Sequence, residues 1–514
     1  FEYHRGTLTS MGRNKRSNRK TEYMMMELEL LATLAALKGA KYPKAEMDDM
    51  WEIILRNQFH DILPGSSIKE VYDVTKVEYE EIAKEIKTLE DERTACVVGQ
   101  GNDTVLFNTL GFDRDDVVTF TGEVPEAFAY GNEVYPVQKT ADGGVAYVKH
   151  IPSKGYVTLT PAAGKAENRL NISGNTIETP FYRISIDKFG GFTSIYDKEA
   201  ERELLLPERT GNELRVYEDK PMCFSNWDID VYYQEKSWRV DEVTDFEWIE
   251  KGPVRATLSV GLKMGDTVIR QKIMFYADTR RIDFETYVDW KFSEHLMKVH
   301  FPLDIHTDEA RFDIQFGNLT RKIHKNTSWD FARFESCGHK WADVSEGGYG
   351  VSLMNDCKYG YSVLDHNLSL TLIKSGTDPQ AADREEHFFT YSLYPHLGGF
   401  AAQNTVHESF NLNVPVKVLA GAPEKDRFSF MSIDRDNVVL ETIKHAENGD
   451  GIIVRLYETE NTRCRVNLST ALDIKNVTET NLTEDEELGD VKANGGSFSF
   501  EIKPYEVKTF RIRF

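Results

Sequence analysis

His60 and Asp61 are the adjacent side chains of this 514-residue chain whose types and position best suit chemistry. They lie in the run Gln58-Phe59-His60-Asp61-Ile62-Leu63-Pro64-Gly65-Ser66-Ser67-Ile68. A neutral imidazole is a zinc ligand, and a carboxylate accepts hydrogen bonds from hydroxyl groups. A lone histidine at a helix end can equally be a polar group that complements the negative end of the helix dipole. The pattern alone therefore leaves both interpretations open.

Two predicted helices hold this pair. Residues 45–59 repeat apolar side chains at three and four positions, which predicts an amphipathic helix, with Met47, Met50, Trp51, Ile54 and Leu55 on its apolar face. Pro64-Gly65 ends the helical stretch, because proline lacks the N–H that a helix needs. We expect Ser67 to cap the next helix, with Glu70 as its reciprocal partner in a capping box. The pair is thus predicted to lie in a short loop between two rigid elements.

The whole chain divides into two halves of different hydrophobic period. Helical stripes within residues 14–98 predict a three-helix, up-down-up bundle. After Cys96 the pattern turns to alternation with Gly- and Asn-rich turns, which indicates antiparallel β-sandwiches with almost no helix. Strands are expected at residues 104–107, 145–148, 254–262, 268–276, 281–288, 369–373, 498–502 and 508–514.

The predicted fold class is therefore α+β and multi-domain, mainly β. We expect a three-helix bundle at residues 14–98, a small β domain at 100–170, a large sandwich at 175–415 and a terminal sandwich at 416–514. The length agrees with several domains of about 150 residues each.

The formal charge of −22 argues against nucleic acid and anionic membranes as partners, since phosphate neutralisation needs clustered cations. No apolar run approaches the roughly 20 residues that span a bilayer. Five cysteines without CxxC spacing favour reduced thiols and a cytoplasmic location. One basic run, Arg13-Asn14-Lys15-Arg16 with Arg19 and Lys20, is interpreted as a solvated face or an inter-domain contact rather than a phosphate site.

The β region offers weaker candidates. Asp228 and Asp230 flank Ile229 on an expected strand, so both carboxylates would face one side, either for acid/base chemistry or as plain exposed aspartates. Two larger sets stay open as well: four histidines share no metal-site spacing, and four aromatic residues suit either sugar stacking or packing. These are His324, His339, His387 and His396, and Trp227, Trp329, Trp341 and Tyr359.

Residues 51–67, with the Gln-Phe-His-Asp-Ile-Leu-Pro-Gly-Ser-Ser-Ile sequence, resemble the bacterial and cytosolic branch of the glycoside hydrolase family 38 α-mannosidases. Further motifs that resemble this family lie at residues 1–10, 226–233, 340–346, 355–360 and 391–396. The resemblance implies that His60 is one of four zinc ligands and that Asp61 contacts the bound mannose. It also implies that the large sandwich is of the galactose-mutarotase-like supersandwich type.

The resemblance further implies retaining hydrolysis of an α-mannosidic bond, by a catalytic α/β domain that precedes Phe1 and carries the nucleophile and the other three zinc ligands. We therefore expect the chain to be a C-terminal portion, with residues 1–13 ending a catalytic-domain strand, and to be inactive alone. No catalytic residue is assigned in this chain; Glu2 is a candidate pocket residue by position only.

The expected partners are an α-mannoside or mannose-containing oligosaccharide and the protein's own catalytic domain, and a homo-oligomer is left open. A mannosylglycerate-type hydrolase would share these motifs. Two other hypotheses stay open: a carbohydrate-binding β protein without chemistry of its own, and a structural or assembly scaffold.

Overall fold

The computed structural model describes residues 4–377, 383–400 and 402–514, and only the backbone of residues 402 and 403. Its first elements are a short 3₁₀ helix and three long helices: η1 (Arg5–Leu8), α1 (Gly12–Leu37), α2 (Lys44–Asn57) and α3 (Lys69–Val98). All later sheets are antiparallel in the pairings that the structure describes. The predicted order, helices first and β structure after them, is confirmed.

The helices share a core of apolar side chains at the predicted three and four spacing. The central members of this core are Met25, Leu28, Met47, Met50, Ile54, Tyr79, Ile82 and Ile86. Leu55, predicted to lie on the apolar face of residues 45–59, is 58% exposed, and Ile68 is 64% exposed. The bundle therefore leaves apolar surface uncovered near the loop that joins α2 to α3.

The small β domain follows the bundle. A three-stranded sheet contains β2 (Arg114–Thr121), β5 (Gln138–Thr140) and β6 (Gly143–Ile151). A second sheet contains β1 (Asp103–Asn108), β3 (Ala127–Tyr130), β4 (Glu133–Pro136), β7 (Gly155–Ala162), β28 (Lys417–Gly421) and β29 (Arg427–Ser429). Because β28 pairs with β1 and β29 with β7, residues 417–429 belong to this sheet, although they follow the large sandwich in sequence.

The large sandwich packs three sheets around one apolar core. The longest contains β15 (Glu242–Lys251), β16 (Arg255–Met264), β17 (Thr267–Tyr276), β18 (Ile282–Asp289), β20 (Glu309–Ile314), β21 (Gly317–Lys322), β23 (Trp341–Glu346), β24 (Tyr349–Asn355) and β27 (Glu386–Leu397). The second contains β13 (Glu213–Glu218), β14 (Ser237–Arg239), β19 (His295–Pro302), β22 (Ser336–Cys337), β25 (Gly360–Leu364) and β26 (Asn367–Ser375). The third contains β8 (Asn171–Ser173), β9 (Thr176–Glu178), β10 (Tyr182–Ile186), β11 (Phe192–Asp197) and β12 (Arg202–Glu203). Aromatic side chains such as Phe192, Phe284 and Tyr391 fill the space between the sheets.

The terminal sandwich is built from two sheets. One contains β30 (Met431–Ile433), β33 (Cys464–Thr470), β36 (Ala493–Asn494) and β37 (Ser497–Ile502). The other contains β31 (Val438–His445), β32 (Ile452–Glu458), β34 (Asn476–Thr480), β35 (Glu487–Val491) and β38 (Val507–Arg513). Each of the eight strand ranges expected in the β region falls on a strand of the structure; the strand expected at Asp228 and Asp230 does not.

Short helices interrupt the β region, where almost none were expected: α4 (Ser328–Phe331), the 3₁₀ helix η2 (Val231–Glu235) and α5 (Ala402–Asn413). Val406 and Phe410 of α5 pack with Trp341 of the large sandwich and Tyr457 of the terminal sandwich. α5 therefore joins the two sandwiches. Among the described residues, no helix combines the length and the apolar character needed to cross a membrane.

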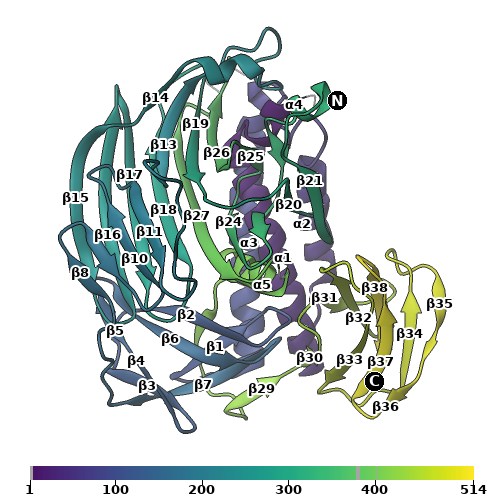
Figure 1. Ribbon diagram of the computed structural model, residues 1–514. Helices are drawn as coiled ribbons and strands as arrows, with labels where there is room; N and C mark the ends of the chain where they lie inside the picture. Colours follow the sequence, from purple (N-terminus) through teal and green to yellow (C-terminus); the bar gives the residue numbers. More distant parts are fainter. Residues whose placement is uncertain (1–3, 378–382, 401) are drawn as a thin grey trace.

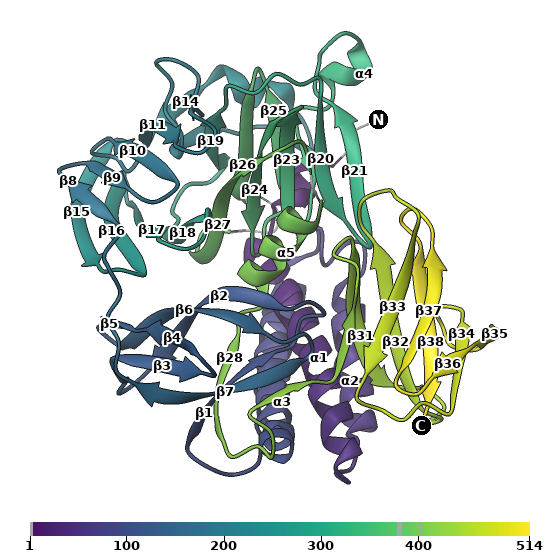
Figure 2. The same ribbon diagram turned by 60° about the horizontal axis from the view of Figure 1, so that its bottom comes forward.

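The bundle contacts every β unit. In Figures 1 and 2 the lower part of the helices lies between the small β domain and the terminal sandwich, and their upper part runs along the large sandwich. Leu31 of α1, Val98 of α3, Val105 of β1 and Leu440 of β31 belong to one buried cluster. The helices that carry the loop between α2 and α3 are therefore packed against other domains on several sides.

Candidate functional site

The loop of residues 58–67 carries the predicted metal ligand and the predicted sugar contact. Its backbone is folded into tight turns: the Ile62 amide donates to the Phe59 carbonyl at 2.8 Å, and the Ser66 amide donates to the Asp61 carbonyl at 3.2 Å. The structure confirms a loop between the two helices, but α2 ends at Asn57, well before Pro64-Gly65, which therefore does not terminate it.

His60 and Asp61 point outward from this loop. The His60 side chain is 76% exposed, the Asp61 side chain is 45% exposed, and His60 Nε2 lies 3.4 Å from Asp61 Oδ2. The Phe59 ring packs beside the imidazole, with centroids 4.1 Å apart. Ser66 Oγ donates to Asp61 Oδ1 at 3.2 Å and so orients the carboxylate. The loop therefore exposes an imidazole and a carboxylate next to each other on its surface.

A buried tyrosine holds the backbone of the pair. Tyr72, on the first turns of α3, is only 2% exposed. Its hydroxyl accepts a hydrogen bond from the Ser67 amide at 3.0 Å and lies 3.2 Å from the Asp61 carbonyl and 3.1 Å from the Ile62 carbonyl, to which it donates. One hydroxyl thus joins the middle of the loop to its last residue.

The neighbouring elements fix the rest of the loop. Lys15 Nζ of α1 donates to the Leu63 carbonyl at 2.8 Å, and Asn226 Nδ2 of the large sandwich donates to the Gly65 carbonyl at 3.0 Å. Gly65 has φ +92°, and a Cβ there would lie 2.6 Å from the Ser10 carbonyl oxygen, so only glycine fits. The loop is clamped by α1, α3 and the sandwich at once.

The predicted capping box of Ser67 and Glu70 is wrong. α3 begins at Lys69, and its N-cap, Ile68, makes no side-chain cap hydrogen bond. The physical reason lies in Tyr72, whose hydroxyl takes the Ser67 amide and thereby ends the loop one residue before the helix starts. The loop is thus positioned by tertiary contacts and not by a local helix cap.

The start of α1 is bound by a distant carboxylate. Asp383, 2% exposed, accepts hydrogen bonds from the amides of Met11 and Gly12, the latter at 2.7 Å. Burial raises the pKa of Asp383 to about 6. Burial likewise lowers the pKa of Lys15 to about 7, against the opposing attraction of Asp383, while Nζ also donates to the Ser10 carbonyl. A polar, largely buried junction therefore lies directly beneath the loop.

The basic run of α1 forms an inter-domain contact, one of the two interpretations left open by its sequence. The Arg19 guanidinium lies 4.2 Å from the centre of the Tyr359 ring and donates to Asn355 Oδ1 at 2.9 Å. Lys20 Nζ pairs with Asp356 Oδ2 at 3.1 Å. These cations therefore attach the bundle to the large sandwich.

The expected strand at Asp228 and Asp230 is wrong, since both residues lie in a loop before η2. Asp228 Oδ1 accepts from the His4 amide at 3.1 Å, and Asp230 Oδ2 accepts from the Met222 amide at 2.8 Å. The hydrogen bond from the Met222 amide to Asp230 closes residues 222–230 into a loop, which is incompatible with an extended strand there. Both carboxylates thus bind main-chain amides; Glu2 lies outside the described residues.

None of the other histidines named from the sequence forms a hydrogen bond or ion pair with His60 or Asp61 in the described part of the chain, and His324 Nδ1 lies 3.3 Å from Asp330 Oδ2. Burial lowers the pKa of His339 to about 4 and that of His387 to about 3, and His396 Nε2 lies 2.8 Å from Asp343 Oδ2. The set of aromatic candidates divides: Trp341 is fully buried, Tyr359 packs under Arg19, Trp227 is partly buried, and Trp329 is 61% exposed.

His60 is suited to supply one of the four ligands of a zinc site. Zinc takes four ligands in a tetrahedral arrangement, and an exposed imidazole beside a carboxylate has the right chemistry for such a centre. No group of three or more His, Cys, Asp or Glu residues that could hold a metal occurs among residues 4–377, 383–400 and 402–514. A complete site would need ligands from outside the part of the chain described here.

Sequence reasoning missed the residues that clamp the loop. Lys15 is part of the basic run and Asn226 is part of a motif of the β region, while no sequence motif singles out Tyr72. No local signal identifies the partner of a hydroxyl, an ammonium group or an amide when that partner is distant in sequence.

Three family models match the chain in order. They are described as the alpha mannosidase middle domain, at residues 2–96, the glycosyl hydrolases family 38 C-terminal domain, at residues 177–382, and the glycosyl hydrolases family 38 C-terminal beta sandwich domain, at residues 437–510. The first match spans the bundle and its loop, and the other two span the large and terminal sandwiches.

Two similar proteins are Alpha-mannosidase G of Dictyostelium discoideum and Alpha-mannosidase 2C1 of Mus musculus. Each is 30% identical over 100% of this chain, which covers 52% of the first and 50% of the second. The chain thus spans about half the length of these relatives. A Putative mannosylglycerate hydrolase of Halalkalibacterium halodurans is 19% identical over 90% of the chain. A crystal structure of an alpha-mannosidase from Enterococcus faecalis V583 superposes with a TM-score of 0.82 at 17% identity, covering 99% of this chain and 68% of that one, which shows a shared fold.

Proposed function

We propose, from the premise that this chain carries the middle and C-terminal domains of a glycoside hydrolase family 38 α-mannosidase, that it takes part in zinc-dependent hydrolysis of α-mannosidic bonds. The observation that carries the proposal is the exposed His60-Asp61 pair on a loop whose backbone is held from three sides. A clamped loop with free polar side chains is suited to completing a site that another domain begins.

His60 would bind the metal as a neutral imidazole, because the protonated ring has no lone pair to donate. Zinc, when bound, would supply a positive centre that orients sugar hydroxyl oxygens. Asp61, ionised and held by Ser66, would accept a hydrogen bond from a mannose hydroxyl, a charge-assisted bond of about 1.5–3 kcal/mol. The nucleophile and the acid/base group would come from the catalytic domain.

Exposed apolar residues beside the pair support the docking of that domain. Leu55 and Phe59 precede His60 and are 58% and 53% exposed, and Ile68 follows the loop and is 64% exposed. Large apolar side chains left exposed around a polar pair are typical of a surface that another domain covers.

The test compares this 514-residue chain with the protein that also carries the catalytic domain, using an aryl α-mannoside as substrate. The longer protein should hydrolyse it, and the chain alone should not, since loss of a nucleophile costs a factor on the order of 10⁶ in rate. Turnover by the chain alone, in proportion to its concentration, would refute the proposed division of labour.

The same preparation tests the nature of the substrate and the location. Preference for mannosylglycerate over α-mannosides would support the alternative hydrolase, although the more similar relatives carry α-mannosidase names.

The five unpaired cysteines favour the cytoplasm. Fractionation that recovers the longer protein outside the cytoplasm would contradict this.

A further inference from the structure

The start of α1 supports the loop between α2 and α3 in two ways. The Met11 side chain, at the N-cap of α1, belongs to a small apolar cluster with Tyr72 and Ile62. Lys15, in the first turns of the helix, donates from Nζ to the Leu63 carbonyl at 2.8 Å. Because the exposed imidazole and carboxylate immediately precede Ile62 in the chain, their position depends on where the start of α1 lies.

Local chemistry does not hold this helix start in place. α1 has no acidic residue in its first turn, and its N-cap, Met11, makes no side-chain cap hydrogen bond. Arg13, Lys15 and Arg16 instead bring three cations to the end of the helix that already carries the positive pole of its dipole. Met11 itself has φ +56°, a left-handed conformation that costs free energy for a residue with a Cβ. The helix start therefore needs support from elsewhere in the fold.

Asp383, on the segment that leads into β27 of the large sandwich, supplies that support. Its Oδ1 accepts a hydrogen bond from the Gly12 amide at 2.7 Å, and its Oδ2 accepts from the Met11 amide. One buried carboxylate thus satisfies two of the amides that a helix start leaves free, and its charge offsets the cations. The contact is close-packed, since a Cβ on Gly12 would lie 3.4 Å from Lys358 Nζ and 3.6 Å from His387 Nδ1.

We propose that Asp383 is a positioning residue for His60 and Asp61, acting through the start of α1. It fixes the backbone at Met11, whose side chain supports the apolar side of the loop. It thereby also places Lys15, one turn further along the helix, so that the ammonium group reaches a loop carbonyl. This role rests on the proposed function, because the pair that is positioned is the one proposed to bind zinc and sugar.

The test measures hydrogen exchange in the 514-residue chain, by mass spectrometry of peptides that cover residues 10–14 and 60–68. Asp383→Ala should speed exchange about tenfold at residues 10–14, where two amides lose a charged acceptor. Exchange should also rise at residues 60–68, where the substitution removes no contact directly. Asp383→Asn keeps one acceptor oxygen and should give an intermediate effect. In the longer protein, zinc affinity and turnover of an aryl α-mannoside should fall in the same order.

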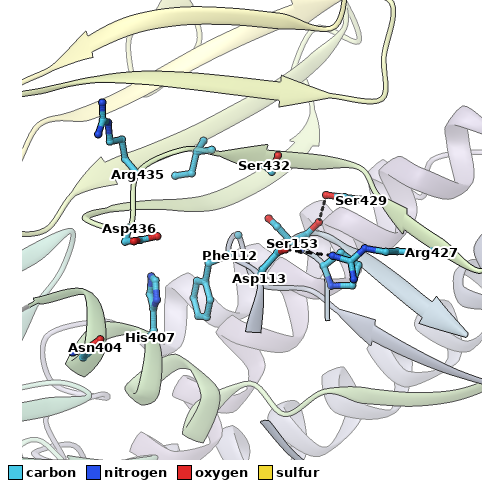
Figure 3. A pocket seen from close by; sticks show the side chains of 13 residues that line it. Phe112, Asp113, Ser153, Asn404, His407, Arg427, Ser429, Ser432, Arg435 and Asp436 are labelled. Carbon is cyan, nitrogen blue, oxygen red and sulfur yellow. Dashed lines mark hydrogen bonds and ion pairs between the residues drawn. The ribbon is translucent and has the colours of Figure 1, made fainter. Parts of the chain in front are cut away.

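Two other carboxylates provide the controls. Glu385→Gln changes a neighbour that pairs with the Arg13 side chain and not with the helix backbone. Asp113→Asn changes a carboxylate that also accepts from a main-chain amide, that of Ser153 at 2.8 Å, but in the small β domain beside a cavity of about 560 Å³ (Figure 3). Both should leave exchange at residues 60–68 at the wild-type level. Thermal melting checks that all variants are folded.

Faster exchange confined to residues 10–14 would overturn the proposal, because Asp383 would then only cap the helix. An equal rise at residues 60–68 in either control would overturn it too, as would wild-type zinc affinity and turnover in Asp383→Ala. If the longer wild-type protein hydrolysed no α-mannoside, the proposed function would fail. Exchange at residues 60–68 would still decide whether Asp383 positions the loop.

Discussion

Removing one hydroxyl, by Tyr72→Phe, should impair the site far more than the stability of the protein. The hydroxyl accepts from the Ser67 amide at 3.0 Å and donates to the Asp61 and Ile62 carbonyls at 3.2 and 3.1 Å, which amounts to one accepted and one shared, donated bond. At about 1 kcal/mol net for each, the loss is about 2 kcal/mol, against a typical total of about 5–15 kcal/mol. The melting temperature should fall by only a few degrees.

The same change frees the backbone that carries His60 and Asp61. A displacement of about 1 Å in a positioned group can cost on the order of 10²-fold in rate. We therefore expect turnover of an aryl α-mannoside by the longer protein to fall by about that factor, together with its zinc affinity. In the 514-residue chain, hydrogen exchange at the Ser67 amide should speed up, which reports the loosened loop without any activity assay.

Ser67→Ala is the matched control. The Ser67 hydroxyl caps no helix, since the N-cap is Ile68, and alanine keeps the backbone N–H that binds Tyr72. Stability, turnover and zinc affinity should stay close to wild type. Wild-type turnover in Tyr72→Phe, or a loss confined to Ser67→Ala, would refute the assignment of Tyr72 as the residue that positions the loop.

Three further predictions concern the same region. Asp61→Asn in the longer protein should keep its zinc but lose activity, because a charged acceptor becomes a neutral amide; metal analysis beside an activity assay checks this, and loss of zinc would contradict it. Lys15→Met should remove a pH-dependent part of the stability: burial lowers the Lys15 pKa from 10.5 to about 7, so between these values the unfolded chain binds more protons and wild-type stability rises with pH. Urea denaturation of both proteins at about pH 7 and about pH 9 measures this, and a constant difference between them would refute it. Asn226→Ala should loosen the Gly65 carbonyl and lower turnover with a stability loss of about 1–3 kcal/mol, and unchanged turnover would show that this contact does not aim the loop.

The sequence was sufficient for the order and type of the main elements. The three and four spacing of Met47, Met50 and Ile54 reflects a real bundle core, and the alternation after Cys96 reflects real strands. It was insufficient where polar residues are buried against another unit. The first turns of α1 carry buried Lys15 and Arg19, so their pattern resembles a solvated face, although it contacts the sandwich.

The candidate site was predictable in part for a related reason. The apolar stripes of the two flanking helices predict a loop between them, and the loop with its two outward side chains is found, although α2 already ends at Asn57, before Pro64-Gly65. The prediction that Ser67 caps α3 was wrong, because the Tyr72 hydroxyl accepts from the Ser67 amide. Tyr72 itself has the pattern of a core residue, so the sequence does not reveal that its hydroxyl also binds the loop. α5 was missed because its polar residues mask the few buried ones that join two sandwiches.

The most direct test of the account is the zinc content of the longer protein with His60→Ala, measured beside wild type and beside Ser67→Ala. If His60 is a ligand, zinc occupancy should fall in His60→Ala, and excess zinc should restore part of the activity, because three ligands of a tetrahedral site would remain. Full zinc occupancy in His60→Ala would contradict the account, and the exposed imidazole would then be only a polar group at the end of a helix.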